Sequence, residues 1–387
     1  MTNTKSTGSD IRPYRIDIPQ ADLDDLMDRL ARTRFAPASP GDSWDYGMPT
    51  DYLRDFVTYW RTEFDWRAQE RRINTFPQFV TEIDGQTVHF VHVRSAEPNA
   101  TPLVLTHTYP GSFVDLLDMV GPLTDPVAHG GRAEDAFSVV IPSIPGFTFS
   151  MPLVDRGWTM ARVARTWDVL MRRLGYDSYG THGSDAGAMV SRELALLNPD
   201  GFLGAHVLQL FSFPSGDPAE FEKMTPKDYA ALEFAGWFQD HAGFSAMLGS
   251  RPQTVAHALA DSPAGQLAWN ELFVSFGEGS LLTRDQILTQ VTLYWLTNTS
   301  GTTARFYYEE GHSGVEPTVN AAPTGVAVFA DDFKSMRPFA ERDNTNIVHW
   351  AEYESGGHFA SMEVPEVVAA DVRTFFAGLR TKSAAHG

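Results

Sequence analysis

The stretch Gly183-Ser184-Asp185-Ala186-Gly187 decides the fold of this chain. The stretch follows a strand-like run at Tyr179 and Thr181, and a helix-like run over 189–197 comes after it. Small residues two positions on either side of a central residue are typical of a sharp strand-to-helix turn, which presents the central side chain at its tip. We expect the Asp185 carboxylate to face a pocket, where a carboxylate can attack carbon and form an ester. The alternative is a glycine-rich turn with a solvated Asp.

Composition limits the classes of protein that the chain can represent. The 387 residues, 43% hydrophobic and 12% aromatic, suffice for a large core and about two or three domains. A formal net charge of −19 argues against nucleic acid and anionic membranes as partners, because like charges repel. The absence of cysteine excludes disulfides and thiolate catalysis. The polar start and the lack of a long apolar run predict no signal segment, no membrane span and a cytoplasmic location.

The pattern along the chain predicts an α/β core with a helical insertion. A hairpin over 79–93 turns at Asp84-Gly85, a strong turn signal. The expected strands are 15–18, 103–106, 137–141, 202–208, 325–329 and 347–350, and the expected helices are 21–32, 51–64, 161–174 and 365–379. Alternating strands and helices imply a parallel sheet covered on both faces. Residues 214–317 are rich in helix formers and aromatics, which indicates a helical insertion.

Two further polar sites follow predicted core strands. Asp331 and Asp332 come after one strand, and His358 follows the last. Catalytic groups in open α/β sheets collect at the carboxyl ends of strands, and the order nucleophile, acid, histidine is that of a hydrolytic triad. In this interpretation Asp185 attacks a substrate carbon and forms an ester. His358 then takes a proton from the water that attacks this ester, and Asp332 orients the imidazole. Each residue alone is more often structural, whereas the set in this order favours catalysis.

The loop 107–112, directly after the strand 103–106, supplies a fourth element. A backbone N–H in such a loop can complete an oxyanion hole with the N–H of Ala186. Pro110 has no N–H, so we predict Tyr109 as the second donor. We interpret His107 as a residue that braces the loop rather than as a base.

With these motifs in place, the chain resembles the microsomal-type epoxide hydrolases of the α/β-hydrolase superfamily. The resemblance covers 12–379, and its most specific matches are Pro110-Gly111-Ser112-Phe113, Pro142-Ser143-Ile144-Pro145-Gly146-Phe147, Ser191-Arg192-Glu193-Leu194-Ala195, Arg305-Phe306-Tyr307 and Gly356-Gly357-His358-Phe359-Ala360. It implies an α/β-hydrolase fold: a mostly parallel sheet with helices on both faces, a helical cap and an N-terminal wrapping segment.

The resemblance also implies a division of the chain and a set of partners. Residues 11–75 would pack on cap and core, 76–213 and 318–380 would form the core, and 214–317 the cap. Apart from the resemblance, the Ser, Thr and Gly content of residues 1–10 predicts that they are disordered. The substrate would be a small-molecule epoxide, with no cofactor and no metal, and a homodimer is a candidate oligomeric state.

Carried over by position, Asp185 would be the nucleophile, His358 the base and Asp332 the triad acid, with Asp331 as the competitor for that role. Tyr307 would be a cap tyrosine that donates to the epoxide oxygen. The implied product is a vicinal diol.

The chain departs from the family pattern around the site. Thr108 and Tyr109 stand where the family commonly has Gly and Trp, Ala186 stands where it has Trp, and Phe244 falls where a second cap tyrosine is expected. Losing one phenol donor could slow the reaction roughly 10²–10³-fold. The candidate substitutes are Tyr308, Tyr294, Trp237 and Tyr109. The small Ala186 suggests a bulky substrate, such as a secondary metabolite.

Two other functions remain open from the sequence. One is another Asp-nucleophile hydrolase of the dehalogenase kind, which would need halide-binding donors that Ala186 does not provide. The other is a binding or ring-closing protein on the same fold, because fold alone does not fix function.

Overall fold

The structure of the chain is a computed structural model that describes residues 10–41, 44–275, 281–315 and 318–386, with side chains described except at Ser275 and 382–386. The predicted disorder of 1–10 falls outside the described residues except at Asp10. Among the helices within these ranges, none is both long and apolar enough to cross a membrane.

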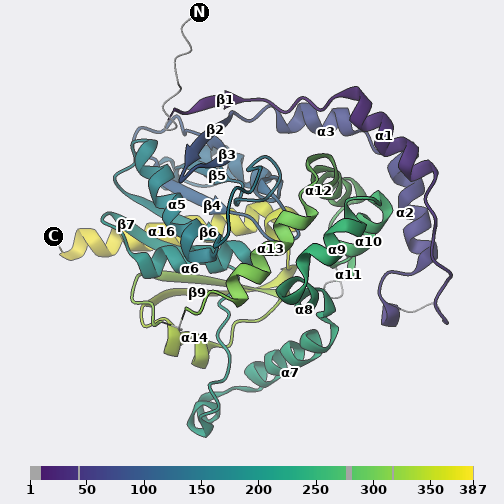
Figure 1. The fold of residues 1–387 in the computed structure, drawn as a ribbon. Coiled ribbons are helices and arrows are strands. Elements are labelled where there is room, and N and C mark those ends of the chain that lie inside the picture. The colour runs from purple at the N-terminus through teal and green to yellow at the C-terminus, as the bar shows by residue number, and fades with distance from the viewer. Residues whose placement is uncertain (1–9, 42–43, 276–280, 316–317, 387) are drawn as a thin grey trace, which may run out of the picture.

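A sheet lies at the centre of the molecule (Figure 1). In the described residues its nine strands follow the order β1-β2-β3-β5-β4-β6-β7-β8-β9. The strands are β1 Arg12–Tyr14, β2 Gln78–Ile83, β3 Gln86–Val93, β4 Thr101–Thr106, β5 Phe137–Pro142, β6 Tyr179–Gly183, β7 Phe202–Val207, β8 Thr324–Asp331 and β9 Ile347–Gly357. The pairs from β1 to β5 are antiparallel, and the pairs from β5 through β4 to β9 are parallel. The predicted mostly parallel sheet is confirmed.

Helices cover both faces of the sheet. The hydroxyl of Thr181 in β6 lies 3.0 Å from that of Ser191 in α6 (Ala186–Leu197), which packs beside α5 (Met160–Arg173). The neighbouring Gly180 faces the other way, where an added Cβ would lie 2.2 Å from Phe376 of α16 (Pro365–His386). Successive strand residues point to opposite faces, so α6 and α16 enclose the sheet between them.

The first part of the chain runs from the sheet edge to the helical insertion (Figure 1). Its helices are α1 Gln20–Ala31, α2 Thr50–Thr62 and α3 Trp66–Ile73. The strand predicted over 15–18 is wrong, because β1 lies earlier. The N–H of Ile16 donates to Asn74 Oδ1 (3.0 Å), and that of Ile18 donates to Glu70 Oε1 (2.8 Å). The side chains of Asn74 and Glu70 thus take the place of the carbonyl oxygens that a neighbouring strand would offer to these N–H groups.

The helices between β7 and β8 form the cap, as we call the elements α7 to α13. They are α7 Pro226–His241, α8 Gly243–Ser250, α9 Pro252–Leu259, α10 Pro263–Trp269, α11 Leu272–Ser275, α12 Arg284–Thr297 and α13 Ser300–Gly311. Buried side chains of α1 and α2 pack with those of α10 and α12, including Leu26, Trp60, Leu267 and Ile287. The exact limits of the predicted segments 11–75, 76–213, 214–317 and 318–380 stay a prediction.

The remaining elements are short. They are η1 Trp44–Tyr46, η2 Phe113–Met119, α4 Val120–Thr124, η3 Pro126–His129, η4 Ala133–Asp135, η5 Pro218–Lys223, α14 Arg337–Asp343 and α15 Ala360–Glu363.

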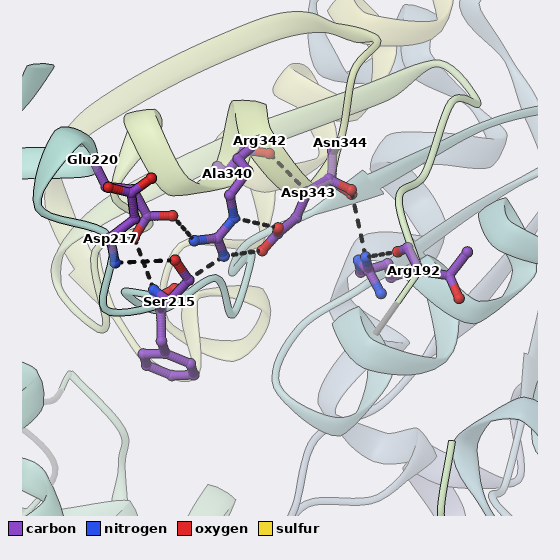
Figure 2. Close-up of polar contacts among 10 residues, drawn as sticks. Arg192, Ser215, Asp217, Glu220, Ala340, Arg342, Asp343 and Asn344 are labelled. Carbon is purple, nitrogen blue, oxygen red and sulfur yellow. Dashed lines mark hydrogen bonds and ion pairs between the residues drawn. The ribbon is translucent and has the colours of Figure 1, made fainter. Parts of the chain in front are cut away.

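A polar cluster ties the chain that leaves the core to α14 (Figure 2). The Arg342 guanidinium donates to the carbonyl oxygen of Phe213 (3.0 Å) and pairs with Glu220 of η5 and with the adjacent Asp343. Glu220 in turn accepts from the N–H of Ser215 (2.8 Å). The segment between core and cap is therefore held to the core at several points.

Candidate active site

The turn after β6 holds Asp185 in a strained conformation. Its φ is 51° and its ψ is −119°, a region that residues with a Cβ seldom adopt. Its N–H donates to Gln209 Oε1 (2.6 Å). A Cβ on Gly183 would lie 2.2 Å from the carbonyl oxygen of Gly187, and one on Gly187 would lie 2.0 Å from that of Thr106 in β4. The small residues are thus required by the close approach of three backbone segments.

Two backbone N–H groups hold the Asp185 carboxylate. The N–H of Tyr109 donates to Oδ2 (2.8 Å), and that of Ala186 also donates to the carboxylate. Burial raises the pKa of Asp185, while His358 and these two donors oppose that rise. The structure therefore brings together the three residues that the sequence analysis assigned to the nucleophile and its oxyanion hole.

His358 lies between Asp332 and Asp185. Its Nδ1 donates to Asp332 Oδ1 over 2.8 Å, and its Nε2 lies 4.0 Å from Asp185 Oδ1. Asp332 is 3% exposed and also accepts from the N–H of Phe333 (2.7 Å). The alternative acid, Asp331, is half-buried at the end of β8, with its backbone paired with Gly357. The structure thus places Asp332 at the imidazole.

The electrostatics of His358 follow from these neighbours. Burial lowers the pKa of the imidazole, and the carboxylates of Asp332 and Asp185 more than offset it, so that the pKa lies above its usual value. The hydrogen bond at Nδ1 leaves Nε2 on the side of the cavity.

Gln209, just after β7, was not predicted. Its amide oxygen accepts from the N–H of Asp185 and its amide nitrogen donates to Asp332 Oδ2. It therefore links the backbone of one carboxylate residue to the side chain of the other, and it is buried. Its position at the carboxyl end of a parallel strand, between those of Asp185 and Asp332, is the one signal that could have found it.

A cavity of about 630 Å³ opens over Asp185. Polar groups are few in its lining, and aromatic and aliphatic side chains predominate. The lining residues are Tyr109, Asp185, Met189, Phe211, Phe213, Pro214, Leu232, Ala235, Gly236, Phe238, Gln239, Ala242, Phe244, Ser245, Leu272, Tyr307, Phe333 and His358. Predicted residues from the core and the cap thus meet around one space.

Two residues predicted to line the site lie outside it. Trp237 is 47% exposed and stacks on His241 at 4.4 Å between ring centroids. Tyr308 is 38% exposed and stacks on His312 at 4.1 Å. Each is one position away on its helix from a residue that does line the cavity, Gly236 or Tyr307. Neighbouring helical residues point about 100° apart, so Trp237 and Tyr308 point away from the space that Gly236 and Tyr307 line.

Two other predicted residues are buried but differently placed. Tyr294 donates its hydroxyl proton to the carbonyl oxygen of Gly111 (2.8 Å), so it braces the loop after β4. Ala186 is buried, and its contribution to the site is its N–H. The loop-bracing role expected for His107 agrees with its ring, which accepts from the N–H of Ile144 (3.1 Å) and contacts the Thr108 carbonyl oxygen (2.9 Å).

One group of side chains within the described residues could hold a metal ion. It comprises His206 of β7, His349 of β9 and Asp371 of α16, whose ligand atoms lie within 4.8 Å of one another. Asp371 already accepts from both imidazoles (2.7 and 2.9 Å) and from the Tyr353 hydroxyl (2.6 Å). These hydrogen bonds satisfy the carboxylate without a metal.

Comparison with known proteins identifies the family. The model of the epoxide hydrolase N terminus matches residues 11–116. A putative epoxide hydrolase of Stigmatella aurantiaca is 41% identical, over 96% of this chain and 86% of that protein. The chain belongs to the epoxide hydrolase family. Epoxide hydrolase 1 of Sus scrofa is 31% identical, over 94% of this chain and 88% of that protein.

Solved structures of this family share the fold over nearly the whole chain. The juvenile hormone epoxide hydrolase of Bombyx mori has a TM-score of 0.88 at 26% identity, covering 97% of this chain and 96% of that chain. The epoxide hydrolase of Aspergillus niger has a TM-score of 0.85 at 29% identity, covering 96% and 97%. The predicted α/β-hydrolase fold is therefore confirmed, and so is the prediction of a hydrolase.

Proposed function

We propose that the chain opens an epoxide to a vicinal diol through a covalent ester on Asp185. The observation that carries the proposal is the position of this carboxylate. Its Oδ2 is held by the Tyr109 N–H at 2.8 Å, its Oδ1 lies 4.0 Å from His358 Nε2, and both residues face the same cavity. The similarity to epoxide hydrolases over 94–96% of the chain supports the choice of substrate.

In the first step, a carboxylate oxygen of Asp185 attacks an epoxide carbon. The new carbon–oxygen bond forms as the ring carbon–oxygen bond breaks, and the electron pair of that bond stays on the ring oxygen. Tyr307 lines the cavity, and its hydroxyl donates a hydrogen bond to this oxygen and supplies a proton, which it regains from water. Burial and the Asp185 charge raise the pKa of Tyr307, so the phenol is protonated and able to donate.

In the second step, water cleaves the ester. His358 Nε2 takes a proton from the water, whose oxygen attacks the ester carbonyl, and Asp332 stabilises the imidazolium through Nδ1. The N–H groups that hold the carboxylate in the free enzyme then stabilise the tetrahedral oxyanion. Collapse of this intermediate breaks the ester bond, and the leaving diol oxygen takes the proton of the imidazolium. The Asp185 carboxyl then loses its proton to solvent, which balances the proton that Tyr307 regained from water.

The shape and chemistry of the cavity support the prediction of a bulky substrate. Its volume of about 630 Å³ and its aromatic lining suit a drug-sized apolar molecule, which such pockets bury largely through apolar contact. A cytoplasmic location and a homodimer stay predictions.

A single turnover in ¹⁸O-labelled water tests the ester mechanism. With enzyme in excess over an aromatic epoxide, we expect the first diol to carry unlabelled oxygen, because that oxygen comes from the Asp185 carboxylate. Mass spectrometry of the diol gives the answer. As a control, enzyme turned over repeatedly in labelled water and moved to ordinary water should transfer the label. Label in the diol of the first turnover would show direct attack by water and exclude the ester.

The pH dependence of ester breakdown follows from the environment of His358. Only the neutral imidazole can accept a proton from water. Against the effect of burial, the Asp332 carboxylate raises the pKa of this imidazole, and it keeps its charge in the ester, where Asp185 has lost its own. The breakdown rate should be full above this pKa and fall about tenfold per pH unit below it. In Asp332→Asn the residual rate should have its midpoint at lower pH, because the carboxylate that raises the pKa is gone. Stopped-flow traces across pH measure both, and an unchanged midpoint contradicts the assignment of Asp332.

A further inference from the structure

We infer that the Tyr109 hydroxyl is the second hydrogen-bond donor to the substrate oxygen, acting together with Tyr307. The inference rests on the proposed function, since it concerns the oxygen released when an epoxide opens. It gives the loop after β4 two roles: its backbone holds the Asp185 carboxylate, and its side chain stabilises the alkoxide.

The first support is the fixed position of Tyr109. Its N–H is bonded to Asp185 Oδ2 at 2.8 Å, the residue is 4% exposed, and it lines the cavity. A side chain so close to the nucleophile and so restricted loses little conformational entropy when it binds substrate.

The second support is the packing of three rings on one wall of the cavity. Tyr109 and Tyr307 meet edge to face, with centroids 5.0 Å apart. Phe244 lies 6.5 Å from Tyr109, nearly parallel to it, and 6.1 Å from Tyr307. Phe244 has no hydroxyl, so this wall offers the substrate oxygen the phenols of Tyr109 and Tyr307.

The third support is the hydrogen-bond state of the Tyr109 hydroxyl. It accepts from Trp269 Nε1 at 3.3 Å, and an indole N–H can only donate. In the described part of the chain neither the Tyr109 hydroxyl nor the Tyr307 hydroxyl donates to an acceptor. The Tyr294 hydroxyl, by contrast, donates to the Gly111 carbonyl oxygen. Burial and the nearby Asp185 charge raise the pKa of both Tyr109 and Tyr307. Both phenols therefore keep a proton available for the alkoxide.

The other polar groups of the cavity are less suited to this role. Gln239 is exposed, so water competes for its amide, and Ser245 lies on the cap helix α8, half-buried. A hydroxyl that accepts a hydrogen bond becomes a better donor, because the two bonds polarise each other. The hydrogen bond from Trp269 Nε1 has this effect on the Tyr109 hydroxyl.

Transient kinetics of Tyr109→Phe test the inference. The variant removes one oxygen atom and leaves the backbone N–H in place. We expect ester formation to slow about 10²-fold, whereas ester hydrolysis should stay within twofold of the wild-type rate. Tyr308→Phe is the matched control, because its hydroxyl lies outside the cavity, and both of its steps should be unchanged. Adding Phe244→Tyr to Tyr109→Phe should recover at least tenfold in ester formation.

Two results would overturn the inference. One is ester formation at the wild-type rate in Tyr109→Phe. The other is equal slowing of both steps, which would show that the loop and its N–H had moved. Failure of the proposed function looks different, because the wild type itself would then form no ester on Asp185.

Discussion

Replacing His358 with glutamine stops turnover at the covalent ester, so that the protein gains the mass of one substrate molecule. Attack by Asp185 needs the carboxylate and the tyrosine donors, all of which remain. Release needs a base for water, and His358 Nε2 is the group placed 4.0 Å from Asp185 Oδ1 to serve as one. Loss of a triad base reduces turnover by on the order of 10⁴–10⁶-fold, which gives the ester time to accumulate.

The conditions of this experiment follow from the charges around Asp185. The His358 charge lowers the pKa of this carboxylate against the effect of burial, so its loss leaves Asp185 harder to ionise. The reaction is therefore run at about pH 8, well above the ordinary carboxyl range. Intact mass spectrometry measures the adduct, and peptide mapping locates it. Asp185→Ala should give no adduct, and an adduct on any other residue, or continued turnover of His358→Gln, would refute the assignment.

Substituting Gly187 with alanine should lower the catalytic rate by displacing the backbone that carries Asp185. The added Cβ would lie 2.0 Å from the Thr106 carbonyl oxygen, and neither side of this contact is a flexible side chain. Relief requires the turn to move away from β4 and hence from the Tyr109 N–H. A displacement of about 1 Å in a catalytic group can cost 10²-fold in rate, and we expect at least that loss. Overpacking of this kind also destabilises by about 1–3 kcal/mol.

Gly378→Ala is the matched control for this substitution. Gly378 lies in α16, and an added Cβ there meets no atom within 4 Å. Alanine is favoured over glycine in a helix by about 1 kcal/mol, so this variant should be fully active and slightly more stable. Steady-state rates and denaturant melts of both variants decide the matter. A Gly187→Ala enzyme with wild-type kcat/KM would show that the turn tolerates the shift.

The sequence predicted the features that are encoded locally. Adjacent residues specify the strand-to-helix turn at 183–187, the Asp84-Gly85 hairpin and the apolar parallel strands. The structure contains all three. The strand expected over 15–18 failed, because the N–H groups of Ile16 and Ile18 bind Asn74 and Glu70, more than 50 residues away. The local sequence pattern does not show whether a backbone N–H will bind a neighbouring strand or a distant side chain.

In the active site, too, the sequence did not reveal features that depend on contacts between distant residues. Asp185, Asp332 and His358 could be proposed from chain order, and the choice of Asp332 over Asp331 needed the 2.8 Å contact to His358. Gln209 escaped notice because a single amide carries no motif, and its role depends on two strands that meet only in the folded sheet. The sequence could not place Trp237, because the hydrophobic residues of α7 are spread around the helix and do not mark one buried face.

The Arg342 cluster has a bearing on which part of the chain between core and cap can move. Phe213 lines the cavity, and its carbonyl is fastened to α14 together with Glu220. The chain between these two residues is thereby fastened at both ends to Arg342 of α14. A displacement of α7 that keeps these contacts therefore has to be absorbed after Glu220, in the residues just before Pro226.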